Sequence, residues 1–296
     1  MTDAPYRYRS SEEDSARWAG FAFRDGDIVI STRSKSGTTW MQMICALLIH
    51  QSPELPEPLS TLSPWLDWLV TPQGEVYGRL ARQPHRRVIK THTPLDGVPI
   101  DARASYIVVA RHPLDMAVSL YHQGDNLDRE RVAALTGTAV ARRRGERPGL
   151  HDWLVSWIDD DPDPREDLDS LPGVMRHLSD AWHRSAEPNV LLVRYADLVR
   201  DLDGQMRKLA DKLGVEVDER VWANLVHAAT FDQMRERPNR LTPTPEGVLK
   251  DEAAFFRRGR PGAAAEVLTS DEIARYEVRV AELASADLVS WLHGEV

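Results

Sequence analysis

The sequence predicts an α/β fold of three layers, in which helices cover both faces of a central parallel sheet. Two observations lead to this prediction. Four short apolar runs, rich in β-branched residues, recur along the chain at residues 28–31, 88–90, 106–110 and 190–193. Helical stretches separate these runs, and strands that alternate with helices typically form a parallel sheet that is buried on both faces.

The spacing of apolar residues indicates where the helices lie. We expect helices over residues 39–50, 114–122, 174–186, 202–213, 219–227 and 270–292. Gly214 follows the fourth of them, at the position where a left-handed residue commonly ends a helix. Thr269 and Glu272 have the spacing of a capping box at the start of the last helix.

The chain of 296 residues is within the range of one large α/β domain. We therefore expect a single domain over residues 1–296, with an N-terminal extension over residues 1–25. Two segments depart from the strand and helix pattern. Residues 124–149 are rich in Arg, Gly and Ala and suggest a lid whose arginines lie on a charged helix face, and the acidic residues 159–169 suggest a solvated loop.

Composition excludes several classes of protein. The net charge of −9 argues against general nucleic-acid binding, which needs a basic face. Cys45 is the only cysteine, so it can form no intramolecular disulfide, and its apolar helix predicts core packing. The N-terminus has no apolar signal segment, and the longest apolar run, residues 43–49, is too short to cross a bilayer. We expect a cytoplasmic protein without membrane insertion.

The strongest functional signal lies between the first strand and the first helix. The segment runs through Lys35-Ser36-Gly37-Thr38-Thr39-Trp40. Its glycine permits close backbone approach, and its lysine and the free N–H groups of the helix favour a phosphate-like anion. The spacing differs from that of the common nucleotide loop, because Lys35 precedes Gly37. A solvated turn is the alternative, but it does not explain why these residue types meet at one junction.

Polar residues also end two other predicted strands. The second strand ends in Lys90-Thr91-His92, and the third ends in Arg111 and leads into a helix that carries Ser119. Ligands of open parallel sheets bind beyond the carboxyl ends of the strands, so these residues should face one crevice. Alone, such a histidine is more often structural, and Arg111 fits an ion pair with Asp115 equally well. Together the three motifs favour a functional site.

The Lys35–Trp40 motif resembles the 5′-phosphosulfate loop of the cytosolic-type sulfotransferases. These enzymes move a sulfonyl group from 3′-phosphoadenosine 5′-phosphosulfate (PAPS) to an acceptor hydroxyl or amine and release PAP. The resemblance spans roughly residues 26–269 and implies a P-loop-like sulfotransferase fold, PAPS as the co-substrate and no metal. It also implies that Lys35, Ser36, Gly37, Thr38, Thr39 and Trp40 bind the cofactor. The chain departs from the family at Arg33-Ser34, where the family usually has an aromatic residue and a proline.

The resemblance assigns the catalytic roles to three residues. His92 matches the general base that takes the proton of the acceptor, and an imidazole has a suitable pKa for this task. Lys35 would stabilise the charge of the leaving phosphate, and Lys90 would lie beside the sulfonyl oxygens. Such preorganised charge is commonly the largest contribution to catalysis.

Further cofactor contacts follow from the same resemblance. Arg111 and Ser119 match the pair that grips the 3′-phosphate. Residues 190–197 resemble the segment that places a tyrosine, here Tyr195, against the adenine. The last family segment closes over the 3′-phosphate and is matched by Phe256, Arg257, Arg258 and Gly259, although a surface charge cluster is the alternative there.

The segment ATFDQM, residues 229–234, resembles the family's Thr-Ser-Phe-x-x-Met motif. It implies that Thr230 and Met234 contact the nucleotide. Phe231 and Trp40 would stack on the two faces of the adenine, because aromatic rings suit a purine.

The acceptor is less well specified. Residues 63–70 stand where the family forms a wall of the acceptor pocket, and Trp65, Leu66 and Trp68 would make that wall apolar. With residues 124–149 and 240–254, they suggest a hydrophobic alcohol or phenol, such as part of a lipid or secondary metabolite. Core packing explains the two tryptophans equally well. Ala265, Ser270 and Ala274 replace the family's short dimerisation motif, so the usual dimer is not expected.

Two other functions remain open at this stage. A small-molecule kinase would share the sheet but use ATP and Mg²⁺, and no aspartate suited to hold Mg²⁺ is evident after the apolar strands. A non-catalytic nucleotide-binding module would have little use for a base such as His92.

Overall fold

The computed structural model describes residues 4–140, 146–242, 247–257, 259 and 261–294. Four strands form one parallel sheet in the order β2-β1-β3-β4. They are β1 (Ile28–Ser31), β2 (Val88–Thr91), β3 (Ser105–Ala110) and β4 (Val190–Arg194). The predicted strands and the parallel sheet are confirmed. Because β1 lies between β2 and β3, the loops leaving β1 and β3 diverge and open a crevice at the carboxyl edge.

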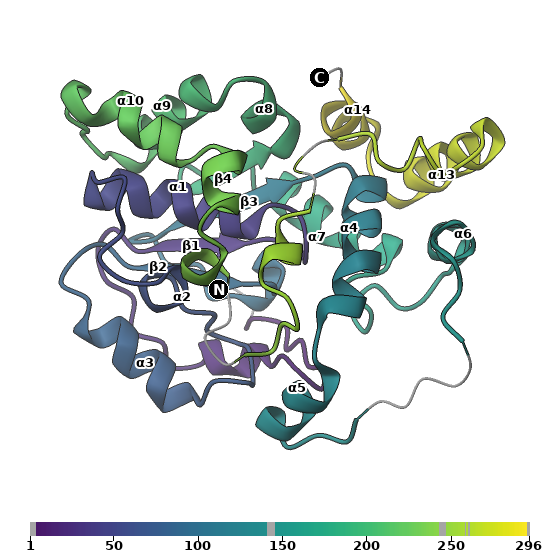
Figure 1. Ribbon diagram of the computed structural model, residues 1–296, viewed down its shortest axis with the longest axis horizontal. Coiled ribbons are helices and arrows are strands. Elements are labelled where there is room, and N and C mark those ends of the chain that lie inside the picture. The colour runs from purple at the N-terminus through teal and green to yellow at the C-terminus, as the bar shows by residue number, and fades with distance from the viewer. Residues whose placement is uncertain (1–3, 141–145, 243–246, 258, 260, 295–296) are drawn as a thin grey trace.

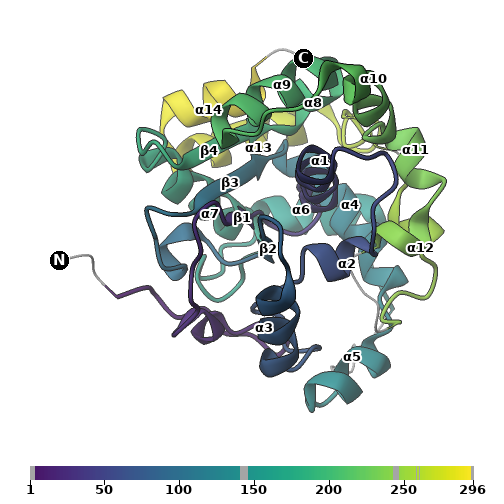
Figure 2. The same ribbon diagram turned by 90° about the vertical axis from the view of Figure 1, so that its left-hand side faces the viewer.

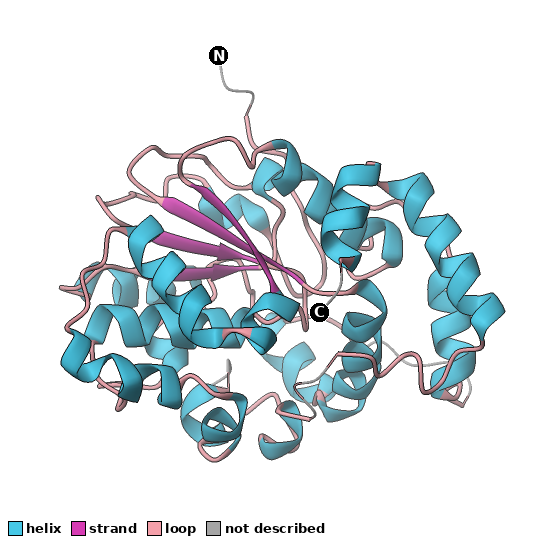
Figure 3. Cartoon of the chain, turned by 90° about the horizontal axis from the view of Figure 1, so that it is seen from above, coloured by secondary structure: helices cyan, strands magenta, loops and turns pink. Residues whose placement is uncertain are grey.

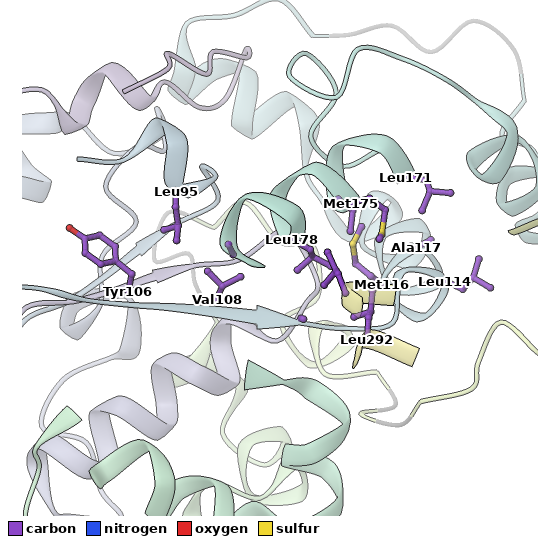
Figure 4. Packing of buried hydrophobic residues seen from close by; sticks show 14 of the residues in the cluster. Leu95, Tyr106, Val108, Leu114, Met116, Ala117, Leu171, Met175, Leu178 and Leu292 are labelled. Atoms are coloured by element: carbon purple, nitrogen blue, oxygen red, sulfur yellow. The ribbon is translucent and has the colours of Figure 1, made fainter. Parts of the chain in front are cut away.

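Side chains of β3 alternate between two hydrophobic cores, one on each face of the sheet. Tyr106, Val108 and Ala110 belong to one core, whereas Ile107 and Val109 belong to the other. This alternation is the period of two that a strand imposes on its side chains. Figure 3 shows the strands side by side among the helices, and Figure 4 shows Tyr106 and Val108 in the first core with residues of three helices.

Helices cover both faces, as the sequence predicts. On the Ile107 face pack α1 (Thr38–His50), α8 (Tyr195–Arg200), α9 (Leu202–Leu213) and α10 (Glu219–Ala228). On the Tyr106 face pack α4 (Pro113–Asn126), α6 (Leu150–Asp159), α7 (Leu171–His183), α13 (Ser270–Leu283) and α14 (Ala286–His293). Figures 1 and 2 show these two layers, with α1 and α7 on opposite sides of the strands.

Shorter elements surround the carboxyl edge and the periphery. They are α2 (Leu59–Leu62), α3 (Gln73–Arg82), α5 (Arg129–Thr136), α11 (Phe231–Arg235), α12 (Pro238–Leu241) and three 3₁₀ turns, Ser15–Trp18, Leu95–Gly97 and Ala253–Phe255. Within the described part of the chain, no helix is long and apolar enough to cross a membrane.

The helix boundaries differ from the prediction most clearly in the last helix and in α7, and α4 also runs on to Asn126. The expected last helix is broken, because Ala284 adopts an extended backbone and Ser285 starts α14 by accepting a hydrogen bond from Leu288 N at 3.4 Å. Helix α7 begins earlier than expected, because Ser170 caps it and Pro172 fits its first turn. The capping box at Thr269 and the left-handed Gly214 are both present. Cys45 is fully buried in the core.

The segment before β1 lies alongside residues 65–70. Asp14 N donates to Asp67 O at 2.9 Å and Leu69 N donates to Glu12 O at 2.7 Å, so Glu13 and Trp68 form an antiparallel bridge. This pairing brings Glu12 and Glu13 to the carboxyl edge of the sheet, where the site lies.

Candidate active site

A pocket of about 440 Å³ lies at the carboxyl ends of β1, β2 and β3. It gathers side chains from the first loop, the strand ends, α4 and the segments near α11 and the Ala253–Phe255 turn. Most of the predicted site residues line it: Lys35, Gly37, Thr38, Thr39, Trp40, Trp65, Trp68, Lys90, His92, Arg111, Ser119, Tyr195, Phe231, Met234, Phe256, Arg257 and Gly259.

Three of the described residues that the sequence predicts for the site are not among the residues that line the pocket. Ser36 is buried in the turn, and Thr230 caps α11 while its Oγ1 donates to His227 O at 2.8 Å. Leu66 is fully buried in the hydrophobic core, so its placement on the acceptor wall was wrong. The side chains of Trp65 and Trp68 reach the pocket, whereas that of Leu66 packs inward. Arg258 lies outside the described residues.

The first loop has a backbone that only certain residues tolerate. Lys35 and Gly37 both have positive φ angles, of 62° and 108°. A Cβ on Gly37 would lie 2.9 Å from Cδ2 of Tyr195, so glycine is required there by conformation and by space. Gly37 caps α1 without a side-chain hydrogen bond, which leaves the first-turn N–H groups of α1 directed at the pocket.

Lys35 is a half-buried cation among other cations. Its Nζ lies 3.3 Å from Gln123 Oε1, 3.5 Å from Phe255 O and 3.8 Å from the centre of the Phe255 ring. Burial, together with the positive charges of Arg111, Lys90 and Arg257, lowers the pKa of Lys35 to about 7. An anionic ligand would relieve this repulsion.

Arg111 and Ser119 meet as the spacing predicts. Arg111 Nη1 donates to Ser119 Oγ at 3.0 Å and to Lys35 O at 2.9 Å, which ties the end of β3 to the first loop. The guanidinium also lies 4.8 Å from the centre of the Tyr195 ring. Its Nε is buried and has no hydrogen-bond partner among the described residues, so a donor is left for a ligand.

His92 is held in one tautomer. Its Nδ1 lies within hydrogen-bond distance of Thr32 O, and because a carbonyl can only accept, Nδ1 carries the proton. Nε2 is then the basic nitrogen. Burial and the charges of Lys90 and Arg33 lower the pKa of His92 well below its usual value, so the ring is neutral near pH 7. A neutral imidazole at the pocket wall can accept a proton.

Lys90 and His92 share an aromatic wall. Lys90 Nζ lies 3.6 Å from the centre of the Trp65 ring, and the rings of His92 and Trp65 pack edge to face with centroids 4.4 Å apart. Burial lowers the pKa of Lys90 to about 7, although the charges of Glu13 and Asp67 raise it. Trp65 stacks on Trp68 with centroids 4.7 Å apart.

Asp67 fixes this wall from behind. It accepts hydrogen bonds from Trp65 Nε1 at 2.8 Å, Thr93 Oγ1 at 2.6 Å and Thr91 Oγ1. The carboxylate thereby joins the tryptophan wall to the residues on both sides of His92. No pattern in the sequence predicts this role, since Asp67 is a single acidic residue between two tryptophans.

Aromatic residues form the other end of the pocket. Trp40 Nε1 donates to Ala229 O at 2.8 Å, and the Trp40 and Tyr195 rings pack edge to face at 5.2 Å. The ring centres of Phe231 and Phe256 lie 6.2 Å apart. A Cβ on Gly259 would lie 2.6 Å from the Phe231 ring, so the chain can pass there only as glycine. These rings offer apolar faces for a planar base.

The structure adds residues that the sequence analysis did not assign. Arg33 lies beneath His92, and Glu12, Glu13, Gln123, Arg129 and Asp169 line the pocket. Burial and the charges of Asp67 and Asp169 raise the pKa of Glu13 to about 8, against the opposing effect of Arg33 and Lys90. The only sequence signal was the unusual Arg33-Ser34 pair. The acidic run 159–169 was interpreted as solvated, but its last residue, Asp169, belongs to the site.

The proposed lid, residues 124–149, borders this pocket through Leu127, Arg129 and Arg147. Arg147 packs 3.5 Å from the Tyr121 ring centre and pairs with Asp125. Arg142, Arg143 and Arg144 belong to residues 141–145, which lie outside the described residues. Movement of the segment stays a prediction. Over the described ranges, no group of three or more His, Cys, Asp or Glu is arranged to hold a metal ion.

A parallel sheet that presents a cationic loop and a neutral histidine at one carboxyl edge defines an α/β enzyme for an anionic ligand. Residues 25–285 match the family model described as a sulfotransferase domain, and the chain belongs to that family. The family expected from the Lys35–Trp40 motif is therefore confirmed.

Relatives and solved structures agree with this assignment. The chain is 38% identical to a glycolipid sulfotransferase of Mycobacterium bovis over 314 aligned residues, which cover 99% of this chain and 95% of the relative. The fold is similar to mouse sulfotransferase SULT7A1 complexed with PAP, with a TM-score of 0.68 and 20% identity. The match covers 94% of this chain and 90% of the mouse chain. It is also similar to retinol dehydratase in a complex with retinol and PAP, with a TM-score of 0.68 and 20% identity. That match covers 92% of this chain and 85% of the retinol dehydratase chain.

The two lysines of the pocket yield the first prediction. Lys35 and Lys90 should each lose their charge with midpoints near 7 in the ligand-free protein, far below the ordinary lysine value of about 10.4, because both ammonium groups are buried beside like charges or aromatic rings. The measurement is an NMR pH titration of ¹³C-labelled lysine. The five lysines of the chain can be assigned by single Lys→Arg variants. Midpoints above about 10 for both would contradict the burial argument.

Proposed function

We propose that the chain transfers the sulfonyl group of PAPS to a hydroxyl of a small acceptor, and less readily to an amine. The observation that carries the proposal is the meeting of Lys35, Arg111 and His92 in one pocket, although they come from three different strand ends. The family supports sulfonyl transfer, and this pocket supplies both an anion site and a base.

The residues present fit a nucleotide with two anionic ends. Lys35 and the first turn of α1 would hold the 5′ end, where their charge and N–H groups converge. Arg111, Ser119 and Arg257 would hold the 3′-phosphate, and the buried Nε of Arg111 offers one further donor. Trp40, Tyr195 and Phe231 would enclose the base. When bound, PAPS supplies an activated sulfonyl group with a phosphate as its leaving group.

His92 and the two lysines would then divide the chemistry. His92 Nε2 would take the proton of the acceptor hydroxyl when its oxygen attacks sulfur and the phosphate leaves. Lys35 would stabilise the charge of the leaving phosphate, and Lys90 would neutralise charge on the sulfonyl oxygens. The Nδ1–H bond to Thr32 O keeps the basic nitrogen free for this step.

For the acceptor, we propose an amphiphile that carries a hydroxyl-rich head group. The wall beside His92 contains the stacked Trp65 and Trp68 and, nearby, Leu127 and Val248, which suit an apolar chain. It also contains Glu12 and Glu13, which can accept hydrogen bonds from hydroxyl groups. The glycolipid sulfotransferase relative supports a lipid-linked sugar. The expected hydrophobic alcohol or phenol thus accounts for only one part of this wall.

A thermal-shift comparison tests the cofactor. A ligand present at a hundredfold excess over its Kd should stabilise the fold by about 2.7 kcal/mol. We expect PAP to raise the melting temperature and ATP with Mg²⁺ to have little effect. Stabilisation by ATP–Mg²⁺ alone would favour the kinase alternative instead. Stabilisation by PAP without any sulfonyl transfer to an acceptor library would favour the non-catalytic module.

The His92→Ala variant tests the base. It should lower turnover by about two to four orders of magnitude, because proton removal from the acceptor is lost. PAP affinity should stay within a few-fold, which calorimetry can measure. His183→Ala is the matched control, since His183 is exposed at the end of α7 and outside the pocket lining. Near-normal turnover of His92→Ala would remove His92 as the base.

Octyl β-glucoside and 1-octanol test the acceptor, because they share an alkyl chain and differ in the sugar. We expect the glucoside to have a kcat/KM at least about tenfold higher, since its hydroxyl groups can form hydrogen bonds to Glu12 and Glu13 that contribute about 0.5–1.5 kcal/mol each. Glu13→Leu should reduce this preference without changing the reaction of octanol, because it removes the hydrogen-bonding group; glutamine would only mimic the protonated carboxyl that a pKa of about 8 implies at neutral pH. Equal values for the two acceptors would argue against the sugar, and a preference for 2-naphthol would support the phenol.

A further inference from the structure

Arg33 is the residue at which the first loop departs from the family pattern, and it is buried beneath the proposed base. Its side chain is only 5% exposed, and it is not among the residues that line the pocket. A guanidinium at this depth needs partners, because burial of an unpaired charge is strongly unfavourable. Its partners are therefore informative.

The guanidinium joins the first loop to the end of β2. Arg33 Nη1 donates to His92 O, and Arg33 Nη2 and Nε donate to Asp169 Oδ1 at 2.7 and 3.2 Å. In the opposite direction, His92 Nδ1 donates to the carbonyl of Thr32, the residue before Arg33. The loop and the histidine are thus tied at two points, one through the backbone of His92 and one through its ring.

Asp169 is itself held by two helices. Its carbonyl accepts a hydrogen bond from Trp157 Nε1 of α6 at 2.9 Å, and it immediately precedes Ser170, the cap of α7. The backbone of Asp169, whose carboxylate orients Arg33, is therefore fixed by contacts with α6 and α7 and does not belong to a free loop. A side chain held from both ends has few alternative rotamers.

The charges around these residues are mixed. Arg33, Lys90 and His177 face His92 and disfavour its protonated form, whereas the carbonyl of Thr32 favours that form. Asp169, Glu13 and Asp67 face Arg33 and favour its charged form. Arginine keeps its charge throughout the accessible pH range, so its effect on His92 does not titrate away.

We propose that Arg33, oriented by Asp169, is a positioning residue that fixes the backbone and ring of His92 for proton transfer. This inference rests on the proposed function, in which His92 is the base. It gives the Arg33-Ser34 departure a role: a charged tether holds the base where the family usually carries an aromatic residue and a proline. A purely structural ion pair would instead affect stability and leave the titration of His92 unchanged.

The test combines turnover with the titration of His92. The variants are Arg33→Met and Asp169→Asn, with PAPS and octyl β-glucoside for turnover and ¹⁵N-histidine NMR of the PAP complex for the pKa and tautomer of His92. Arg176→Met is the matched control, because Arg176 pairs with Asp96 at the partly buried face of α7 and does not line the pocket.

We expect Arg33→Met to lower kcat by about ten- to a hundredfold, since a misplaced catalytic group can cost about a hundredfold. PAP affinity should change less than about threefold, because Arg33 is not part of the pocket lining. Loss of the positive charge should raise the pKa of His92. Asp169→Asn should lower that pKa, because Arg33 then lacks its neutralising partner. Arg176→Met should change neither quantity.

Shifts of the His92 pKa in opposite directions for the two variants, with a lower kcat for Arg33→Met, would support the inference. If Arg33→Met fails to fold, the titration of Asp169→Asn decides, and an unshifted His92 overturns the inference. Wild-type turnover and titration in Arg33→Met, with His92→Ala inactive, would overturn this inference alone. Full turnover in His92→Ala would overturn the proposed base itself.

Discussion

The burial of Lys35 and Lys90 in one pocket is the constraint on which the rest of the site depends. Both ammonium groups are removed from water, Lys35 also beside the charges of Arg111 and Arg257, and the pKa values of the two lysines fall to about 7 as a result. The protein offsets this charge with aromatic faces, carbonyl oxygens and the carboxylates of Asp67 and Glu13. The positive charge of Lys35 that these groups leave uncompensated is one that a nucleotide with two anionic ends would neutralise. The site is therefore electrostatically complete only with its ligand.

The sheet makes this concentration of charge possible. The order β2-β1-β3-β4 places the first loop between the ends of β2 and β3, so Lys35 has Lys90 on one side and Arg111 on the other. The loop can approach Tyr195 and Val109 closely only because Gly37 has no Cβ. A residue with one more carbon at that position would push the helix start and its N–H groups away from the strands. Topology and one glycine thus set the geometry on which the charges act.

The nucleotide side of the site could be predicted because its parts are local in sequence. Strand, loop and helix follow each other around Lys35. Arg111 and Ser119 are joined by a single strand-to-helix connection, so their spacing in the sequence is enough to bring Arg111 Nη1 within 3.0 Å of Ser119 Oγ. The acceptor side could not be predicted in this way. Glu13 reaches it through pairing with the segment of Trp68, and Asp169 reaches it at the end of a loop more than a hundred residues from Arg33. Leu66 was misplaced because an irregular segment has no period that tells which side chains face inward.

This difference has a physical origin that bears on how specificity is built. Recognition of phosphate requires N–H groups of a loop and a helix, which one short motif can supply, so its residues stay together in the chain. Recognition of an acceptor requires a wall of particular shape and polarity, and the wall that we propose is assembled from the N-terminal segment, residues 63–70, the region after α4 and the residues just before α7. Arg33 lies where the two halves meet, because it belongs to the phosphate loop and contacts both the acceptor-side Asp169 and the backbone of His92. In the proposed function, a change in the acceptor wall at Asp169 would therefore reach His92 directly through the side chain of Arg33, whereas the nucleotide end would keep its own, separate contacts.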